Sequence, residues 1–406
     1  MSGDNSLRRA RRVPYFARPF ALHLYIAAFA CAIFFGFSSI ASAQEKLHAD
    51  VHETIVHVPV VVKDRYNKIY RAEIPVTIFR PDGDGPFPLL ILNHGRGASA
   101  EIRAKLVRSV YQSAGRYFVR KGFAVAMPTR LGNGDQPELG DPESFTSCSN
   151  PAYSALVEAA VEQAQAVIGY MQKQLYIDPK KLVIAGQSVG GLMSVALTAK
   201  RPPGLIAAID FSGGHGGNPD THPGEPCLPN QLKNLFAQYA AEQAGKPPVP
   251  MLWIYTENDQ FFKPKYTQAW HAAYVENGGV AEFHLLPPFK SNGHFVFVNG
   301  NDIWQPIVES FLNKVGFDKP GMIATPPATN FARLDDDDAL PYPNKLSKMS
   351  YGQFLEKPKP RAFAISKNRH LGFASGDDAK SRALALCRQF ADAQCRLYAV
   401  DDEVVW

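Results

Sequence analysis

The sequence predicts an α/β fold in which a mainly parallel sheet is covered by helices on both faces. Three observations support this prediction. Short apolar, β-branched runs alternate along the chain with longer segments of helical periodicity. Most apolar runs end in a loop rich in glycine, asparagine or aspartate. A hydrophobic content of 46% with 20% charged residues is that of a chain with a packed core.

The first half of the chain supplies the centre of the sheet. We predict strands over Glu53–Val62, Tyr70–Arg80, Phe87–Leu92 and Gly122–Met127, and helices over Ala100–Arg120 and from Pro151 onward. The Phe87–Leu92 run is continuously apolar, which is typical of a central strand buried on both faces. From Val157 to Met171, apolar residues recur every three or four positions and therefore share one helix face.

The second half continues the alternation of strands and helices. We predict strands over Leu182–Ala185, Leu205–Phe211, Val249–Tyr255 and Ala281–Leu286, and helices over Val189–Leu197, Gln231–Ala244, Pro264–Glu276 and Ile303–Val315. Residues 131–150 and 212–230 are rich in glycine and proline, so we expect them to be loops.

By composition the chain divides into four parts. Residues 1–43 have the features of a signal peptide, 44–317 form the α/β domain, 318–345 form a linker rich in proline and aspartate, and 346–406 form a small α+β module. Within this module we predict strands over Ala362–Ile365, Leu371–Ala374 and Cys395–Val400, and a helix over Ala379–Phe390.

The N-terminal segment has the three features of a secretory signal peptide. Five arginines precede the apolar run Phe20–Ile40, and Ala41-Ser42-Ala43 provides a cleavage site. An uncleaved membrane anchor is the alternative, because the apolar run approaches the thickness of a bilayer. We therefore expect an exported protein, periplasmic or secreted. Residues 1–43 contribute four of the five net positive charges, so the charge gives no argument for nucleic-acid binding.

Cysteine usage agrees with export. Cys148, Cys227, Cys387 and Cys395 remain after removal of the signal, and an even number in an oxidising compartment favours disulfides. We predict a Cys148–Cys227 bridge between two loops at the same edge of the sheet, and a Cys387–Cys395 bridge that compensates for the thin core of the small module. The sequence has no Cys-x-x-Cys or His-Glu-x-x-His motif, so no metal site is predicted.

The strongest chemical signal is Gly186-Gln187-Ser188-Val189-Gly190. It lies between a predicted buried strand and a predicted helix, where a tight turn requires glycine on both sides of the serine. Such a turn raises the serine Oγ above the sheet edge. We therefore predict that Ser188 is a nucleophile.

A serine nucleophile needs a base, and the base needs an orienting acid. In parallel topology these groups follow in chain order, each on a loop after a strand. Asp259 follows the strand Val249–Tyr255 and is the predicted acid, with Glu257 and Asp210 as rivals.

The predicted base is His294, which lies between the last strand and the last helix of the α/β domain. Three other histidines are rivals with weaker positions. His284 lies within a predicted strand, and His215 and His222 precede the acid in the sequence.

The loop that follows the central strand Phe87–Leu92 is suited to stabilising negative charge. The N–H groups of Val189 and of Gly95 or Arg96 are the predicted oxyanion donors. Arg96 and Arg130 are candidates for binding a substrate carboxylate, and surface arginines are the alternative interpretation. His94, in the same loop, is expected to be structural.

These motifs resemble the α/β-hydrolase superfamily, and the chain most resembles its dienelactone hydrolase-like members over roughly residues 55–316. The resemblance rests on Asn93–Gly97, Gly186–Gly191, Asp259 and His294. It implies an α/β-hydrolase fold with a sheet of about eight strands, and hydrolysis of an ester or related acyl bond without a cofactor. Dienelactone hydrolases proper use a cysteine nucleophile, whereas this chain has Ser188, so their lactone substrate is not carried over.

The sequence thus predicts an exported serine hydrolase that cleaves a carboxylic ester or related acyl bond through an acyl-enzyme. An acyltransferase, a peptidase of the prolyl-oligopeptidase type and a non-catalytic envelope binding protein remain alternatives. The expected partner is a small-molecule acyl substrate, with no nucleic acid, metal or cofactor. We expect no membrane span after signal cleavage, and the C-terminal module is a candidate for binding an envelope component.

Overall fold

The computed structural model describes residues 47–406 except 135–136, 146 and 390–393. The predicted signal peptide, residues 1–43, lies outside the described residues. Among the described helices, none combines the length and the apolar character needed to cross a membrane.

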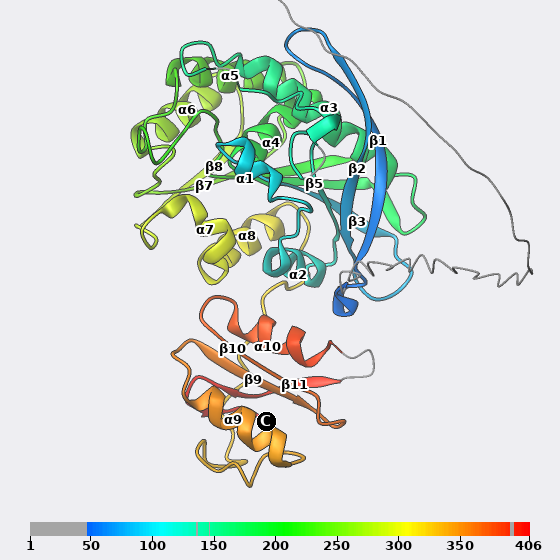
Figure 1. Ribbon diagram of the computed structural model, residues 1–406, viewed down its shortest axis with the longest axis vertical. Coiled ribbons are helices and arrows are strands. Elements are labelled where there is room, and N and C mark those ends of the chain that lie inside the picture. The colour runs from blue at the N-terminus through cyan, green and yellow to red at the C-terminus, as the bar shows by residue number, and fades with distance from the viewer. Residues whose placement is uncertain (1–46, 135–136, 146, 390–393) are drawn as a thin grey trace, which may run out of the picture. The chain divides into compact units, whose positions relative to one another are not determined.

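The α/β domain contains one eight-stranded sheet (Figure 1). Its strands are β1 (Thr54–Lys63), β2 (Ile69–Phe79), β3 (Phe87–Asn93), β4 (Ala124–Pro128), β5 (Ile177–Gln187), β6 (Leu205–Phe211), β7 (Met251–Thr256) and β8 (Ala281–Leu286). Their order is β1-β2-β4-β3-β5-β6-β7-β8, and only β2 runs antiparallel to its neighbours. The predicted α/β fold, with its mainly parallel sheet of about eight strands, is confirmed.

Helices cover both faces of this sheet. The helices of this domain are α1 (Ala100–Ala104), which has no buried residue, and α2 (Gln112–Arg120), α3 (Tyr153–Met171), α4 (Val189–Lys200), α5 (Pro229–Ala241), α6 (Pro264–Glu276), α7 (Val296–Asn299) and α8 (Asn301–Lys314). Residues of α3, α4, α5 and α6 share one core with the sheet, and residues of α2, α7 and α8 share the other (Figure 1). In β5, Leu182 and Ile184 enter the first core and Val183 and Ala185 the second. Alternation across a strand buried on both faces explains its continuous apolar run.

One predicted helix is broken in the structure. The segment Ala100–Arg120 forms two helices, α1 and α2, because the backbone between them bonds to the sheet instead of continuing a helix. The Ser109 N–H donates a hydrogen bond to Thr129 Oγ1, at 2.7 Å, just beyond the end of β4. This contact joins residues distant in sequence, so helical periodicity alone could not reveal it.

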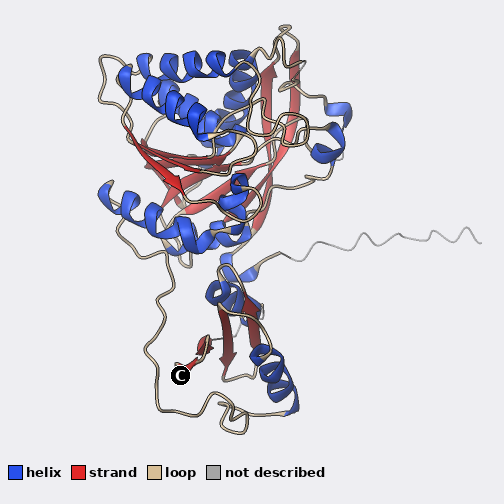
Figure 2. Cartoon of the chain, turned by 90° about the vertical axis from the view of Figure 1, so that its left-hand side faces the viewer, coloured by secondary structure: helices blue, strands red, loops and turns tan. Residues whose placement is uncertain are grey.

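The C-terminal module has its own antiparallel sheet of order β10-β9-β11-β12. Its elements are α9 (Lys345–Leu355), β9 (Arg361–Ser366), β10 (Leu371–Ser375), α10 (Ala379–Cys387), β11 (Cys395–Val400) and β12 (Glu403–Val404). Between α8 and α9 the chain is a loop without helix or strand (Figure 2). The helix α9 was not predicted from the sequence; Asn344 caps it by accepting a hydrogen bond from the Ser347 N–H at 2.8 Å.

Candidate active site

Ser188 occupies the sharp turn between β5 and α4. Its backbone has φ +56° and ψ −120°, a strained conformation for a residue with a side chain. A Cβ on Gly190 would lie 2.3 Å from the Asn93 carbonyl oxygen, and one on Gly186 would lie 2.2 Å from the Gly190 oxygen. Both glycines are therefore required by close backbone approach, as the sequence motif predicts.

Asp259 and His294 meet in a buried hydrogen bond. The loop after β7 carries Asp259, and the short turn Gly293–Phe295 after β8 carries His294. His294 Nδ1 lies 2.9 Å from Asp259 Oδ2, and the two side chains are 4% and 0% exposed. A carboxylate in this position keeps the proton on Nδ1, so Nε2 is left as the acceptor.

Neighbouring groups fix both members of this pair. Asp259 Oδ1 accepts hydrogen bonds from the N–H groups of Phe261 and Phe262, at 2.7 and 3.0 Å. The Phe261 ring stacks on the imidazole of His294 with a centroid distance of 4.0 Å. Gln187 Nε2 donates to the His294 carbonyl oxygen at 3.0 Å, which links the serine turn to the histidine loop. Sequence reasoning did not identify Phe261 or Gln187 as part of the site, because a loop aromatic residue and a glutamine give no distinct signal.

Ser188 and His294 line the same cavity, which has a volume of about 500 Å³. Ser188 is 9% exposed and His294 is 3% exposed. Within the described part of the chain, no hydrogen bond joins the Ser188 hydroxyl to the imidazole. Catalytic hydrogen bonds of this kind are often long in a free enzyme and shorten when substrate binds.

The loop after β3 approaches the serine closely. A Cβ on Gly95 would lie only 3.1 Å from Ser188 Cβ. His94 holds this loop, since its Nε2 accepts from the Arg130 N–H at 3.0 Å and its Nδ1–H donates to the Gly95 oxygen at 2.5 Å. Burial lowers the pKa of His94 well below its ordinary value, and the imidazole stays neutral. The N–H of Val189 begins α4 and has no acceptor within the helix.

Comparison with known proteins shows a similarity to one family. The model of the dienelactone hydrolase family matches residues 107–303, a segment that includes Ser188, Asp259 and His294. Over this segment the chain is similar to the dienelactone hydrolase family. This match supports a hydrolase that acts on ester bonds. No curated protein matches the chain.

Several solved structures resemble this dienelactone hydrolase-like chain. A protein from Klebsiella pneumoniae, provisionally named a dienelactone hydrolase, is 18% identical, with 64% of this chain and 99% of that chain covered and a TM-score of 0.40. The Pyrococcus furiosus esterase Pf2001 is 13% identical, with 64% and 94% covered and a TM-score of 0.41. An acetyl xylan esterase from Paenibacillus sp. R4 is 14% identical, with 65% and 89% covered and a TM-score of 0.42.

The rival acids Glu257 and Asp210 and the rival base His284 have surroundings that differ from those of Asp259 and His294. Glu257 is exposed to solvent, and Asp210 Oδ2 accepts a hydrogen bond from the Tyr255 hydroxyl at 2.9 Å. His284 lies within β8, where its Nε2 is 4.0 Å from Glu282. The hydrogen-bonded pair therefore involves the aspartate and histidine that chain order predicts.

Arg130 does not fit its predicted role as a candidate for binding a substrate carboxylate. Its side chain is fully buried, donates from Nε to Glu143 Oε1 at 2.8 Å, and donates from Nη1 to the His94 oxygen at 2.9 Å. It thus supports the His94 loop and does not reach the cavity. Arg96 does line the cavity, but its Nη2 donates to Asp141 at 2.5 Å. Glu143 and Asp141, the partners of these two arginines, both lie in the glycine- and proline-rich loop 131–150, whose path could not be predicted from the sequence.

Asp210 makes the stability of this dienelactone hydrolase-like chain depend on pH. Burial raises the pKa of its carboxyl group from 3.8 to about 7, and Oδ1 has no hydrogen-bond partner among the described residues. As pH rises from about 4 to about 7, the unfolded chain loses this proton while the folded chain retains it, so folding weakens across that range.

We expect the Asp210→Asn variant to gain stability relative to the natural chain as pH rises from about 4 to about 7, with no further gain above. Asparagine stays neutral and can still accept from the Tyr255 hydroxyl. Urea unfolding at pH 5 and pH 8 measures the difference. An equal effect at both pH values would show that the carboxyl group does not titrate in this way.

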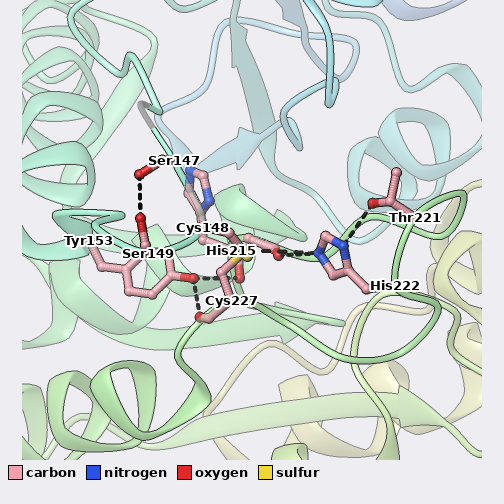
Figure 3. The surroundings of a disulfide bond; sticks show 9 residues. Ser147, Cys148, Ser149, Tyr153, His215, Thr221, His222 and Cys227 are labelled. Carbon is pink, nitrogen blue, oxygen red and sulfur yellow. Dashed lines mark hydrogen bonds between the residues drawn. A yellow bond between two sulfur atoms is a disulfide. The ribbon is translucent and has the colours of Figure 1, made fainter.

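The predicted Cys148–Cys227 disulfide is present, and so is Cys387–Cys395. The Cα atoms of Cys148 and Cys227 are 4.9 Å apart, and the Tyr153 hydroxyl donates to the Cys227 oxygen (Figure 3). His222 Nε2 lies 3.8 Å from Cys227 Sγ. These three side chains are close enough to hold a metal ion, but paired sulfurs offer no thiolate.

The two disulfides should differ in their contribution to stability. Cys148 and Cys227 are separated by 79 residues, whereas Cys387 and Cys395 are separated by 8. Replacing both cysteines of the first pair by serine is expected to cost roughly 4 kcal/mol, about 2 kcal/mol more than the same change in the second pair, because a longer loop loses more entropy when closed. Urea unfolding of both double variants tests this difference, and an equal loss would contradict it.

Proposed function

We propose that this protein is an exported serine hydrolase that cleaves a carboxylic ester or a related acyl bond through an acyl-enzyme. The observation that supports it most is the buried His294–Asp259 hydrogen bond, whose histidine lines the same cavity as Ser188. These are the nucleophile, base and orienting acid that a serine hydrolase requires. The predicted signal peptide and the two disulfides support export.

In the proposed reaction, His294 Nε2 accepts the Ser188 hydroxyl proton as Oγ attacks the substrate carbonyl carbon. The N–H groups of Val189 and of Gly95 or Arg96 face the negative charge that develops on the carbonyl oxygen. His294 then gives the proton to the leaving oxygen, and the C–O bond breaks to leave an acyl group on Ser188. Water, activated by the same imidazole, releases the acid and restores the serine. Asp259 remains ionised and stabilises the imidazolium throughout.

Labelling with a fluorophosphonate tests this proposal. The mature protein is incubated with the reagent, digested and analysed by mass spectrometry, and one adduct on Ser188 is the expected result. Hydrolysis of p-nitrophenyl esters is then compared with hydrolysis of peptide amides, with and without an alcohol acceptor. A folded protein that neither reacts with the reagent nor cleaves any ester would overturn the proposal.

A further inference from the structure

Two cavities meet at Ser188. The larger has a volume of about 500 Å³ and is lined by His294, while the smaller has a volume of about 150 Å³ and is lined by Val189. Arg96 and Phe261 line both cavities, so they lie where the two adjoin. Ser188 is thus flanked by two spaces of different size.

The proposed reaction assigns a substrate half to each cavity. His294 must deliver a proton to the oxygen of the leaving alcohol, so that half of the substrate lies on the imidazole side, in the larger cavity. The acyl half extends the other way, into the smaller cavity beside Val189. A space of about 150 Å³ accommodates a molecule about the size of benzene, which corresponds to an acyl group of roughly four to six non-hydrogen atoms.

The smaller cavity contains an unsatisfied polar side chain, His215. This residue is 7% exposed, and neither of its ring nitrogens has a hydrogen-bond partner among the residues that the structure describes. Its ring stacks on Phe145 with a centroid distance of 5.2 Å and packs against Tyr153 at 5.5 Å. Figure 3 draws it beside the disulfide whose two cysteines also line the cavity. Buried polar groups nearly always have a partner, so an imidazole without one points to a ligand.

The charge state of His215 indicates which chemical group a ligand needs in order to bind it. Burial, followed by the charges of Arg96 and Arg130, lowers the pKa of His215 to about 3. The imidazole is therefore neutral at physiological pH, with one N–H donor and one acceptor nitrogen. A hydroxyl group both donates and accepts, so it is suited to a neutral imidazole. Arg96 Nη1 is buried 3.8 Å from Glu143 Oε2, which is too far for a hydrogen bond, and it makes none to any other described residue. It therefore offers a second donor at the edge of the same cavity.

We propose that the smaller cavity is the acyl subsite, that it takes a short acyl chain carrying a hydroxyl group, and that His215 binds this hydroxyl. This inference rests on the proposed function of Ser188 and adds the class of acyl group. His215 is then a specificity-determining residue and takes no part in proton transfer during the reaction. The sequence analysis considered it only as a rival base.

The test compares esters of one alcohol, such as 4-methylumbelliferone, with butyrate, 3-hydroxybutyrate and octanoate. We expect kcat/KM for the 3-hydroxybutyrate to exceed that for the butyrate by about tenfold, because the unsubstituted chain leaves His215 without a partner. Octanoate should be the poorest substrate, since its chain exceeds the space of the cavity. A natural enzyme without preference for the hydroxylated chain would overturn the proposal, and a bound water would then explain His215.

Variants test whether His215 causes the preference for the hydroxylated acyl chain. His215→Phe keeps the aromatic stacking but removes both nitrogens, and it should lower the 3-hydroxybutyrate to butyrate ratio by about tenfold. His215→Asn restores a donor and an acceptor and should recover part of the ratio. His222→Phe is the matched control: His222 lines the same cavity, but its nitrogens already bond to Thr221 Oγ1 at 2.7 Å and to the Gly216 oxygen at 3.2 Å. That variant should keep the ratio of the natural enzyme.

Comparing the ratio of a variant with the ratio of the natural enzyme cancels the intrinsic reactivity of the two esters. An unchanged ratio in His215→Phe, or an equal change in His222→Phe, would contradict the role of His215. Failure of the proposed function looks different, because no ester is then cleaved and Ser188 is not labelled by the fluorophosphonate. If His215→Phe does not fold, the His215→Asn variant and the substrate series of the natural enzyme still decide the question.

Discussion

Replacing Ser188 by alanine is expected to lower kcat for ester hydrolysis by roughly 10⁵- to 10⁶-fold and to abolish fluorophosphonate labelling. Alanine removes the attacking oxygen but leaves the backbone of the turn unchanged, because both residues carry a Cβ. The residual rate then comes from the oxyanion donors and from substrate binding. Steady-state kinetics on a p-nitrophenyl ester, with circular dichroism to verify folding, measures the effect.

Ser194 provides a matched control for this variant. It lies in the same helix, α4, and its Oγ donates to the Gly190 oxygen at 2.8 Å, outside both cavities at Ser188. The Ser194→Ala variant should retain activity within a few-fold of the natural enzyme. Substantial esterase activity in Ser188→Ala would mean that another nucleophile performs the reaction.

Replacing Asp259 by asparagine is expected to lower kcat by about 10⁴-fold. The asparagine oxygen can still accept from the Phe261 and Phe262 N–H groups, so the loop should be preserved. Its NH₂ group then faces His294 Nδ1 and donates to it. This contact selects the tautomer with the proton on Nε2, which cannot accept the serine proton.

Glu257 is the control for Asp259, since it lies in the same loop but is exposed. Glu257→Gln should have nearly natural activity, and thermal unfolding should show that both variants are folded. The opposite result, with activity lost in Glu257→Gln and retained in Asp259→Asn, would assign the orienting role to Glu257. Measuring kcat and KM separately distinguishes lost catalysis from weaker substrate binding.

Elements that depend on local pattern could be predicted well from the sequence. The bounds predicted for β6, α6 and β8 agree with the structure, because apolar runs and turn residues delimit each of them. The arrangement of Asp259 beside His294 could also be anticipated. In a parallel sheet the carboxyl ends of the strands lie at one edge, so loops distant in sequence converge there.

Features that depend on tertiary partners could not be predicted. Arg130 is indistinguishable from a surface arginine in the sequence, and its burial follows from Glu143, which lies in a loop without periodicity. The break between α1 and α2 depends on a bond from Ser109 to a residue of another segment. His215 stands out only once both of its nitrogens are seen to lack partners in the described part of the chain.

The Cys148–Cys227 bridge has a consequence for the stage at which the smaller cavity beside Ser188 is fully formed. Its two residues form part of the wall of the smaller cavity, so that wall is complete only after the thiols have been oxidised. Newly made chains in a reducing cytosol lack this cross-link. For the exported enzyme proposed above, the wall of the proposed acyl subsite would thus be completed only after passage across the membrane.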